Sequence, residues 1–380
     1  MINKSIAYIF VTSMMKIIEM GGTQMTVYNF SAGPGVLPAT VLDQIQTEMK
    51  SFNGSEMSIL EISHRSKQYE AMELEAEANL RELMNIGDDY AVLFLHGGGT
   101  LQFTNIALNL TDKYHHVAYV DSGHWAQKAM AAAQKIDGLQ VDCVKTAEDH
   151  LPAIRPLDDA PLDYLHITTN NTIEGTTYHQ VPDSVSPLVA DMSSNILAQP
   201  YDVNQFDLIY AGAQKNIGPA GMAVVIVKRD RLTSHPELSE IMDYWLEDQK
   251  HSALNTPPVF CIYAAGLVFK WLKKLGGVPA IYQQNLKQAK ALYDYIDNSK
   301  LFNNSVVHDE RSLTNVVFGT GNQRLDQQFI TDAADKGLVN LAGHRLVGGM
   351  RASLYNAMPT AGVQALITQM KQFEMNHGGL

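Results

Sequence analysis

The chain has 380 residues, 46% of them hydrophobic and 18% charged, a globular composition that excludes a disordered or low-complexity protein. Its 28 Lys and Arg residues against 40 Asp and Glu residues give a net charge of −12, and the absence of a basic run excludes an ordinary nucleic-acid-binding protein. The two cysteines, Cys143 and Cys261, are too far apart in the sequence for a CxxC pair. We therefore expect no metal site and a reducing, cytoplasmic location.

The first 24 residues are expected to be a dispensable extension ahead of Met25. The apolar run at residues 5–15 is too short to cross a bilayer as a helix. No small-residue cleavage site follows it, which argues against a signal peptide. Weak attachment to a membrane surface is the alternative for this segment.

Short apolar runs alternate with helical runs through the middle of the chain. Continuous apolar runs of this kind predict strands that are covered on both faces. Because helices separate them, they favour a largely parallel sheet in an α/β domain. The expected strands are residues 90–95, 117–120, 164–169, 188–190, 207–210 and 223–227, and the expected helices are residues 101–110 and 125–134.

The pattern changes after Pro258. A strongly helical stretch at residues 259–275 precedes a long amphipathic helix at residues 279–299, which is suited to bridge two domains. Strands and helices then alternate again, which predicts a smaller α+β domain. These elements are expected at residues 314–318, 327–336, 350–355 and 362–375.

A run of three glycines, Gly97 to Gly99, follows the first predicted strand and precedes a predicted helix. Glycines allow a ligand to approach the backbone closely, and a helix N-terminus offers free N–H groups, so Gly98, Gly99 and Thr100 could bind a phosphate. A tight turn without a ligand is the alternative. An esterase oxyanion loop beginning at His96 would need a G-x-S-x-G motif, which the chain lacks.

Two further residues stand next to predicted strands of the same sheet. Asp191 follows an apolar run, where a strand end would direct its carboxylate into the ligand-binding crevice of an α/β sheet. Lys215 is a lone lysine in a glycine-rich turn, where burial would favour its neutral, nucleophilic amine. The alternatives are a helix N-cap or a turn residue for Asp191 and a solvated loop residue for Lys215.

Taken together, these features match the requirements of pyridoxal 5'-phosphate. This cofactor needs a phosphate-binding loop, a carboxylate at its pyridine nitrogen and a lysine at its aldehyde. Trp125 could stack on the cofactor ring, or it could simply pack in the core.

Several longer motifs then make the resemblance specific. The chain resembles the class V aminotransferases of fold type I, and within them it is similar to the phosphoserine aminotransferase family over residues 25–380. The motifs are Asn29-Phe-Ser-Ala-Gly-Pro, Glu61-Ile-Ser-His-Arg, Gly97-Gly-Gly-Thr-Leu-Gln-Phe, Asn171-Thr-Ile-Glu-Gly, Ala190-Asp-Met-Ser-Ser, Ala213-Gln-Lys-Asn, Asn255-Thr-Pro-Pro and Gly343-His-Arg-Leu-Val-Gly-Gly-Met-Arg-Ala-Ser.

The resemblance implies an α/β fold with a mostly parallel seven-stranded sheet in a large domain, residues 41–283. Residues 25–40 and 284–380 would form the small α+β domain. Lys215 would be the catalytic residue. The implied cofactor contacts are Gly99, Thr100, Trp125, Thr172, Asp191, Gln214, Lys215, Asn255 and Thr256, and the implied substrate contacts are Ser31, His64, Arg65, His344, Arg345 and Arg351.

Two of the implied contacts concern a second subunit. Asn255 and Thr256 would reach the cofactor phosphate of the other subunit, so the active unit is expected to be a homodimer. One position departs from the family, because Thr100 stands where the family often has an arginine.

The implied reaction transfers an amino group between L-glutamate and 3-phosphohydroxypyruvate, giving O-phospho-L-serine and 2-oxoglutarate by ping-pong kinetics. It would serve serine biosynthesis, and the family also suggests a role in pyridoxine biosynthesis. The alternatives are another class V aminotransferase acting on small amino acids and a non-catalytic protein that binds pyridoxal phosphate. A cysteine desulfurase would need a mobile nucleophilic cysteine, whereas Cys261 lies in an apolar helical run.

Overall fold

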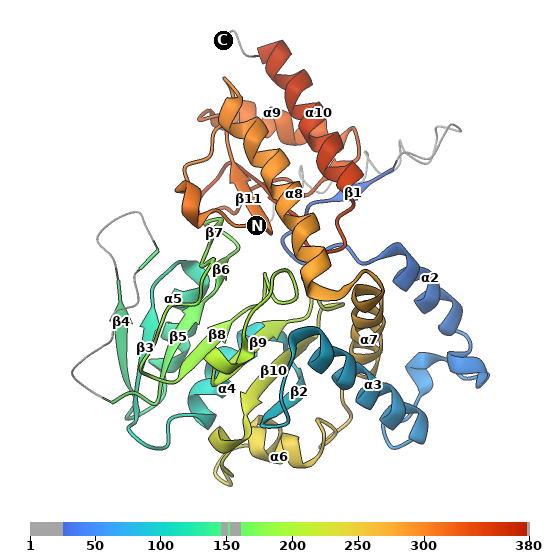
Figure 1. The fold of residues 1–380 in the computed structure, drawn as a ribbon, viewed down its shortest axis with the longest axis vertical. Helices are drawn as coiled ribbons and strands as arrows, with labels where there is room; N and C mark the ends of the chain where they lie inside the picture. The colour runs from blue at the N-terminus through green and yellow to red at the C-terminus, as the bar shows by residue number, and fades with distance from the viewer. Residues whose placement is uncertain (1–25, 146–150, 153–160, 378–380) are drawn as a thin grey trace, which may run out of the picture.

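The computed structural model describes residues 26–145, 151–152 and 161–377 of the chain. The expected extension, residues 1–24, lies outside this part. Figure 1 shows a sheet-containing part below and a smaller part above, with the long helix α8 (Gly277–Asn298) running from one to the other. In the described ranges, no helix is both long enough and apolar enough to cross a membrane.

A seven-stranded sheet forms the centre of the larger part. Its strand order is β2-β10-β9-β8-β5-β3-β4. Strand β10 runs antiparallel to β2 and β9, and the other neighbouring pairs are parallel, which confirms the predicted α/β fold with a mostly parallel sheet. The strands are β2 (Tyr90–His96), β3 (His116–Val120), β4 (Gln140–Val144), β5 (Tyr164–Thr168), β8 (Leu188–Asp191), β9 (Leu208–Gly212) and β10 (Met222–Lys228).

Apolar runs located six of these strands because their residues are buried on both faces of the sheet. Most strand ends differ from the prediction by one or two residues, and one strand was missed. Strand β8 continues through Asp191, one residue beyond the expected end. Strand β4, with the sequence QVDCV, was not predicted because it lies at the sheet edge, is partly exposed and has no continuous apolar run.

Helices cover both faces of the sheet, and alternate residues of each strand point to opposite sides. In β2, Val92 and Phe94 join one hydrophobic cluster, whereas Leu93 and Leu95 join the other. The first cluster includes residues of α2 (Ala39–Glu48), α3 (Lys67–Met84) and α7 (Val259–Lys274), and the second includes residues of α4 (Gly98–Asn109), α5 (His124–Ala133) and α6 (Tyr244–Gln249).

The smaller part has its own hydrophobic cluster, which contains residues of α8 and of the elements that follow it. The N-terminal segment joins this cluster, because β1 (Tyr28–Asn29) pairs with β12 (Leu338–Val339) and Phe30 is fully buried there. The remaining elements of this part are β11 (Asn315–Phe318), which pairs with β13 (Met350–Ser353), and the helices α9 (Gln323–Ala334) and α10 (Thr360–His377).

The predicted domain boundary between residues 283 and 284 falls inside helix α8. Ile281 packs in the cluster around the sheet, and Ala289 packs in the smaller cluster. The division into residues 41–283 and residues 25–40 with 284–380 therefore stays a prediction, which this change of packing along one continuous helix supports.

A buried carboxyl group on α3 gives a testable consequence for stability. Glu73 is 4% exposed, and burial, followed by the charges of Glu77 and Glu70, raises its pKa from 4.5 to about 7. The folded chain therefore holds this proton more tightly than the unfolded chain, so the stability contributed by this group falls as the pH rises from 4.5 to about 7. We expect Glu73→Gln to stabilise the protein by about 1–3 kcal/mol at pH 8 and by little at pH 5.

Thermal or urea unfolding at both pH values measures this difference. Glu75→Gln is the matched control, because Glu75 lies on the same helix but is exposed and pairs with Lys270 at 2.7 Å. The control should show no gain that grows with pH. An equal effect of Glu73→Gln at both pH values would contradict the assigned pKa.

Candidate active site

One pocket contains most of the residues that the sequence predicted to bind a cofactor. It lies at the edge of the sheet where β8 ends at Asp191 and where α4 begins after β2. Such a position, beyond the carboxyl ends of strands, is where α/β sheets generally bind ligands. The lining residues are Gly99, Thr100, Phe103, Trp125, Thr168, Asn170, Thr172, Asp191, Ser193, Ser194, Gln214 and Lys215.

Lys215 lies in the turn between β9 and β10. Its Nζ donates a hydrogen bond to Oγ1 of Thr172 at 2.8 Å. Burial lowers the pKa of Lys215 from 10.5 to about 8; the nearby charge of Asp191 opposes this shift and that of Arg351 adds to it. Near neutral pH a much larger fraction of this amine is therefore neutral than of an ordinary lysine, and the neutral form is the one that acts as a nucleophile or base.

Asp191 ends β8 inside the pocket and is 6% exposed. One of its carboxylate oxygens, Oδ1, accepts a hydrogen bond from the backbone N–H of Ser193 at 2.8 Å. In the parallel sheet Asp191 is paired in register with Thr168 on one side and Tyr210 on the other. The carboxylate is thus held by strand register and by a backbone donor, and it is not a helix cap.

Behind Asp191 lies a buried polar group that sequence reasoning missed. The hydroxyl of Tyr210 is within 2.9 Å of Nε2 of His166, and the pKa of Tyr210 is raised by burial and then by the nearby charge of Asp191. Burial lowers the pKa of His166 to about 3, so this imidazole stays neutral. The only sequence signal was a lone histidine and a tyrosine within apolar strands, and their proximity depends on the register of β5, β8 and β9.

The glycine run at residues 97–99, at the start of α4, brings its backbone close to the side chain of Ser193. Gly97 and Gly98 have φ angles of 90° and 66°, a conformation that favours glycine. A Cβ atom at Gly99 would lie 3.3 Å from Oγ of Ser193, whose oxygen accepts a hydrogen bond from the Gly212 N–H. Ser193 is a further pocket residue that the sequence did not single out.

Some of the predicted substrate-binding residues lie near the pocket and others lie away from it. Arg351 reaches the pocket: its Nη1 donates to the backbone carbonyl of Thr172 at 3.2 Å, and its buried Nε has no partner among the described residues. Ser31 lies on a segment near Lys215, because a Cβ atom at Gly33 would be 3.8 Å from Cγ of Lys215. The Ser31 hydroxyl itself accepts a hydrogen bond from the Gly33 N–H.

His344 and Arg345 lie in the loop between β12 and β13. The ring of His344 is 5.8 Å from the ring of His124, the neighbour of the pocket residue Trp125. Charges from Arg345 and Arg351 both contribute to lowering the pKa of His344, after burial and the charge of His124. His344, Arg345 and Arg351 therefore lie close to one another on one side of the pocket.

Besides Ser31, His344, Arg345 and Arg351, four more predicted residues do not line this pocket within a single chain: His64, Arg65, Asn255 and Thr256. His64 is half-buried, and the other three are exposed. The backbone carbonyl of Thr256 is 2.9 Å from Nε2 of His96, which holds this loop close to the glycine turn. The roles predicted for Asn255 and Thr256 depend on a second subunit, and the substrate contacts predicted for His64 and Arg65 stay predictions.

Cys261 lies in α7 with its thiol toward the carbonyl of Ala220 at 3.5 Å, away from the candidate pocket, which does not favour a cysteine desulfurase. No group of three or more metal-ligating side chains occurs in the part of the chain that the structure describes.

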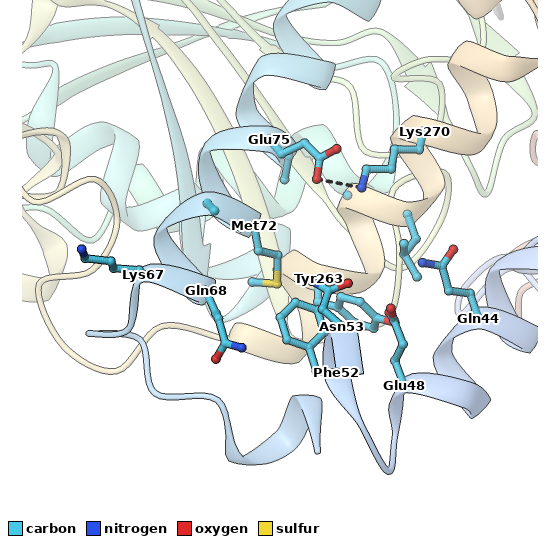
Figure 2. A pocket seen from close by; sticks show the side chains of 14 residues that line it. Gln44, Glu48, Phe52, Asn53, Lys67, Gln68, Met72, Glu75, Tyr263 and Lys270 are labelled. Carbon is cyan, nitrogen blue, oxygen red and sulfur yellow. Dashed lines mark hydrogen bonds and ion pairs between the residues drawn. The ribbon is translucent and has the colours of Figure 1, made fainter. Parts of the chain in front are cut away.

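A larger hollow lies elsewhere, between α2, α3 and α7. Figure 2 shows that Glu75 and Lys270 form an ion pair on one side of it and that Phe52 and Tyr263 lie close together on another. A hydrogen bond joins Tyr263 to Glu48 at the same place. None of the predicted cofactor or substrate residues lines this hollow, so the pocket at Lys215 is the candidate active site.

Comparisons with known proteins agree with this assignment. The profile of the aminotransferase class-V family matches residues 27–366. A phosphoserine aminotransferase of Limosilactobacillus fermentum is 54% identical over 354 residues, covering 92% of this chain and 99% of the relative. The corresponding protein of Listeria monocytogenes is 51% identical and covers 91% of this chain and 96% of the relative.

Solved structures give the same result. The phosphoserine aminotransferase of Bacillus circulans matches with a TM-score of 0.89 and 40% identity, covering 92% of this chain and 99% of that chain. A phosphoserine aminotransferase of Trichomonas vaginalis with bound pyridoxal phosphate has a TM-score of 0.86 and 35% identity, covering 91% of this chain and 100% of that chain. By sequence, by fold and by the residues that meet in its pocket, the chain belongs to the class V aminotransferases.

Proposed function

We propose that this chain is a pyridoxal-phosphate-dependent phosphoserine aminotransferase. It transfers an amino group between L-glutamate and 3-phosphohydroxypyruvate, giving O-phospho-L-serine and 2-oxoglutarate. The observation that carries the proposal is the meeting of Lys215, Asp191 and Gly99 in one pocket, with Arg351 beside them. Sequence identity of 51–54% to phosphoserine aminotransferases supports the choice of substrate.

The residues of the pocket fit the cofactor. Gly99 provides a close backbone approach at the start of α4, where free N–H groups favour a phosphate. Oγ1 of Thr168 is buried in the pocket wall and has no hydrogen-bond partner among the described residues. Thr100 and Gln214 would complete the phosphate end, Trp125 would lie on the ring face, and Thr172 would bond the edge of the ring that carries the hydroxyl group.

Bound pyridoxal phosphate supplies an aldehyde that accepts the amino group and a ring that accepts an electron pair. Lys215 would hold this aldehyde until an amino-acid substrate displaces it. The freed amine of Lys215 would move the proton from the substrate Cα, because its lowered pKa of about 8 leaves part of it neutral. Asp191 would favour a proton on the ring nitrogen through its negative charge.

Substrate recognition falls to the cationic side of the pocket. Arg351 would bind the α-carboxylate, since its unpaired Nε and its guanidinium fork suit a two-point contact. His344 and Arg345 would bind the phosphate of the substrate, and Ser31 would join them from the segment that passes beside Lys215. Thr100 cannot supply the charge that the family's frequent arginine would supply, so the remaining cations carry a larger share of binding.

The active unit is proposed to be a homodimer with shared sites. Asn255 and Thr256 would contact the cofactor phosphate of the partner subunit, and His64 and Arg65 would contact its substrate. Their location outside the pocket of their own chain supports this arrangement. Leu60, four residues before His64, is 63% exposed and would be covered by the partner. We also propose a cytoplasmic location, which the two free cysteines support, and a role in serine biosynthesis.

A spectroscopic experiment tests the proposed function. The purified protein should absorb in the visible range through its bound cofactor, and L-glutamate should bleach this band. Addition of 3-phosphohydroxypyruvate should restore it and release O-phospho-L-serine. A spectrum that does not respond to L-glutamate would favour a non-catalytic binding protein, whereas recovery with pyruvate or glyoxylate but not with the phosphorylated acid would favour another class V aminotransferase.

A further inference from the structure

A second imidazole lies at the cationic side of the pocket. His124 is the first residue of α5, directly before the pocket residue Trp125. Its ring centre is 5.4 Å from that of Trp125 and 5.8 Å from that of His344. The planes of the two histidine rings are tilted by 41°, so the rings do not stack flat on each other. The two imidazoles therefore form a pair that comes from α5 and from the β12–β13 loop.

The hydrogen-bonding capacity of this pair is mostly unused. Nδ1 of His344 accepts a hydrogen bond from the Leu346 N–H at 3.3 Å, and no other contact of its ring nitrogens occurs among the described residues. The ring nitrogens of His124 make no hydrogen bond or ion pair within the same part of the chain. Half-buried imidazoles with free nitrogens are suited to bind an anionic oxygen.

Glu174 fixes the position of His124. Its Oε1 accepts a hydrogen bond from the backbone N–H of His124 at 2.8 Å, at the N-terminus of α5. A Cβ atom at the preceding Gly123 would lie 2.6 Å from the carboxyl carbon of Glu174, so the glycine is needed for this close approach. Glu174 thus contacts the backbone of His124 and not its imidazole. The imidazole therefore stays available to bind a ligand.

The surrounding charges favour an anion between the two rings. Arg345 and Arg351 are the cationic groups near His344, and Glu174 is the neighbouring carboxylate. The pKa of His344 is lowered, first by burial and then by the charges of His124, Arg351 and Arg345, while Glu174 acts in the opposite direction. Such mutual repulsion is relieved when a doubly charged phosphate binds.

We propose that His124 is a specificity-determining residue that binds the phosphate group of the substrate together with His344. The inference rests on the proposed function and adds to it a residue on α5 that contacts the phosphate monoester. The ligand class is a phosphorylated amino or 2-oxo acid. A carboxylate substrate such as L-glutamate has a smaller charge at this end and depends less on the second imidazole.

Two variants test the proposal in the holoenzyme. His124→Phe keeps an aromatic ring against Trp125 but removes both ring nitrogens, and His124→Asn keeps a small donor. Half-reactions with O-phospho-L-serine and with L-glutamate are measured for each. Loss of a hydrogen bond to a charged group should lower kcat/KM for O-phospho-L-serine by roughly 10- to 100-fold in His124→Phe, mainly through KM. The value for L-glutamate should change less than about threefold, and His124→Asn should recover part of the loss.

Competition by inorganic phosphate gives a readout that does not depend on the variant's turnover of phosphoserine. Phosphate should inhibit the L-glutamate half-reaction of the wild type and should do so more weakly in His124→Phe. His308→Phe is the matched control, because His308 is 83% exposed and pairs with Asp309 outside the pocket. It should behave like the wild type.

Equal losses for both amino donors would overturn the proposal, because a merely structural role of His124 would affect both. Unchanged kinetics for O-phospho-L-serine would overturn it as well, while leaving the proposed function intact. If the wild type itself fails to use O-phospho-L-serine but responds to L-glutamate, both the proposed function and this inference are wrong. The wild-type arm therefore separates the two failures.

Discussion

Replacement of Lys215 by alanine should abolish transamination and prevent covalent attachment of the cofactor. The amine is the group in the pocket whose lowered pKa of about 8 suits both the covalent bond and the proton transfer at the substrate Cα. Because one side chain performs both tasks, we expect kcat to fall by more than about 10⁴-fold. Turnover assays and borohydride reduction followed by mass spectrometry of the peptide containing residue 215 measure the two effects.

Lys128→Ala provides the matched control for this experiment. Lys128 is an exposed lysine of α5 and does not line the pocket. It should retain full activity, and its peptide should gain no mass from reduced cofactor. Full turnover of Lys215→Ala, or attachment of the cofactor at another lysine, would defeat the proposed function.

Asp191→Asn should give the second largest loss. The amide keeps the size of the side chain and can still accept the hydrogen bond from the Ser193 N–H, so we expect the fold to be preserved. It removes the negative charge that holds a proton on the cofactor ring, and such preorganised charges commonly contribute roughly 10²–10³-fold to kcat. The measurements are kcat for the glutamate half-reaction and the visible spectrum of the bound cofactor.

Asp183→Asn is the control, because Asp183 is an exposed carboxylate in the loop before β8. It should leave both the rate and the spectrum unchanged. If Asp191→Asn turned over L-glutamate at the wild-type rate with an unchanged spectrum, the carboxylate would not face the ring nitrogen. Lys215 could then still be the catalytic residue, so the two predictions are independent.

The sequence located the sheet strands that contain the site because their apolar character depends on local composition alone. Buried strands such as β9 and β10 are apolar on both faces, and no tertiary information is needed to find them. The edge strand β4 lacked this signal because it is partly exposed. The amphipathic helix α3 was not predicted either, since many charged residues separate its buried positions.

The residues of the candidate site also fall into those that the sequence could predict and those that it could not. Lys215 and Asp191 could be found because each interrupts or ends an apolar run in a turn or at a strand end. Glu174, Tyr210 and His166 could not be found, because their importance arises from contacts between segments that are distant in the chain. A glutamate that holds a backbone N–H 50 residues away has no signature in a single sequence.

The continuity of helix α8 has a mechanical consequence for catalysis. Asp191 ends β8 and Lys215 lies between β9 and β10 in the larger part, whereas Arg351 lies on β13 in the smaller part. Midway along the helix, fully buried Asn285 donates hydrogen bonds to the carbonyl of Ala198 at 3.0 Å and to Oδ1 of Asn356 at 2.9 Å. A change in the distance between the Lys215 amine and the Arg351 guanidinium would therefore require helix α8 to bend or the hydrogen bonds of Asn285 to break.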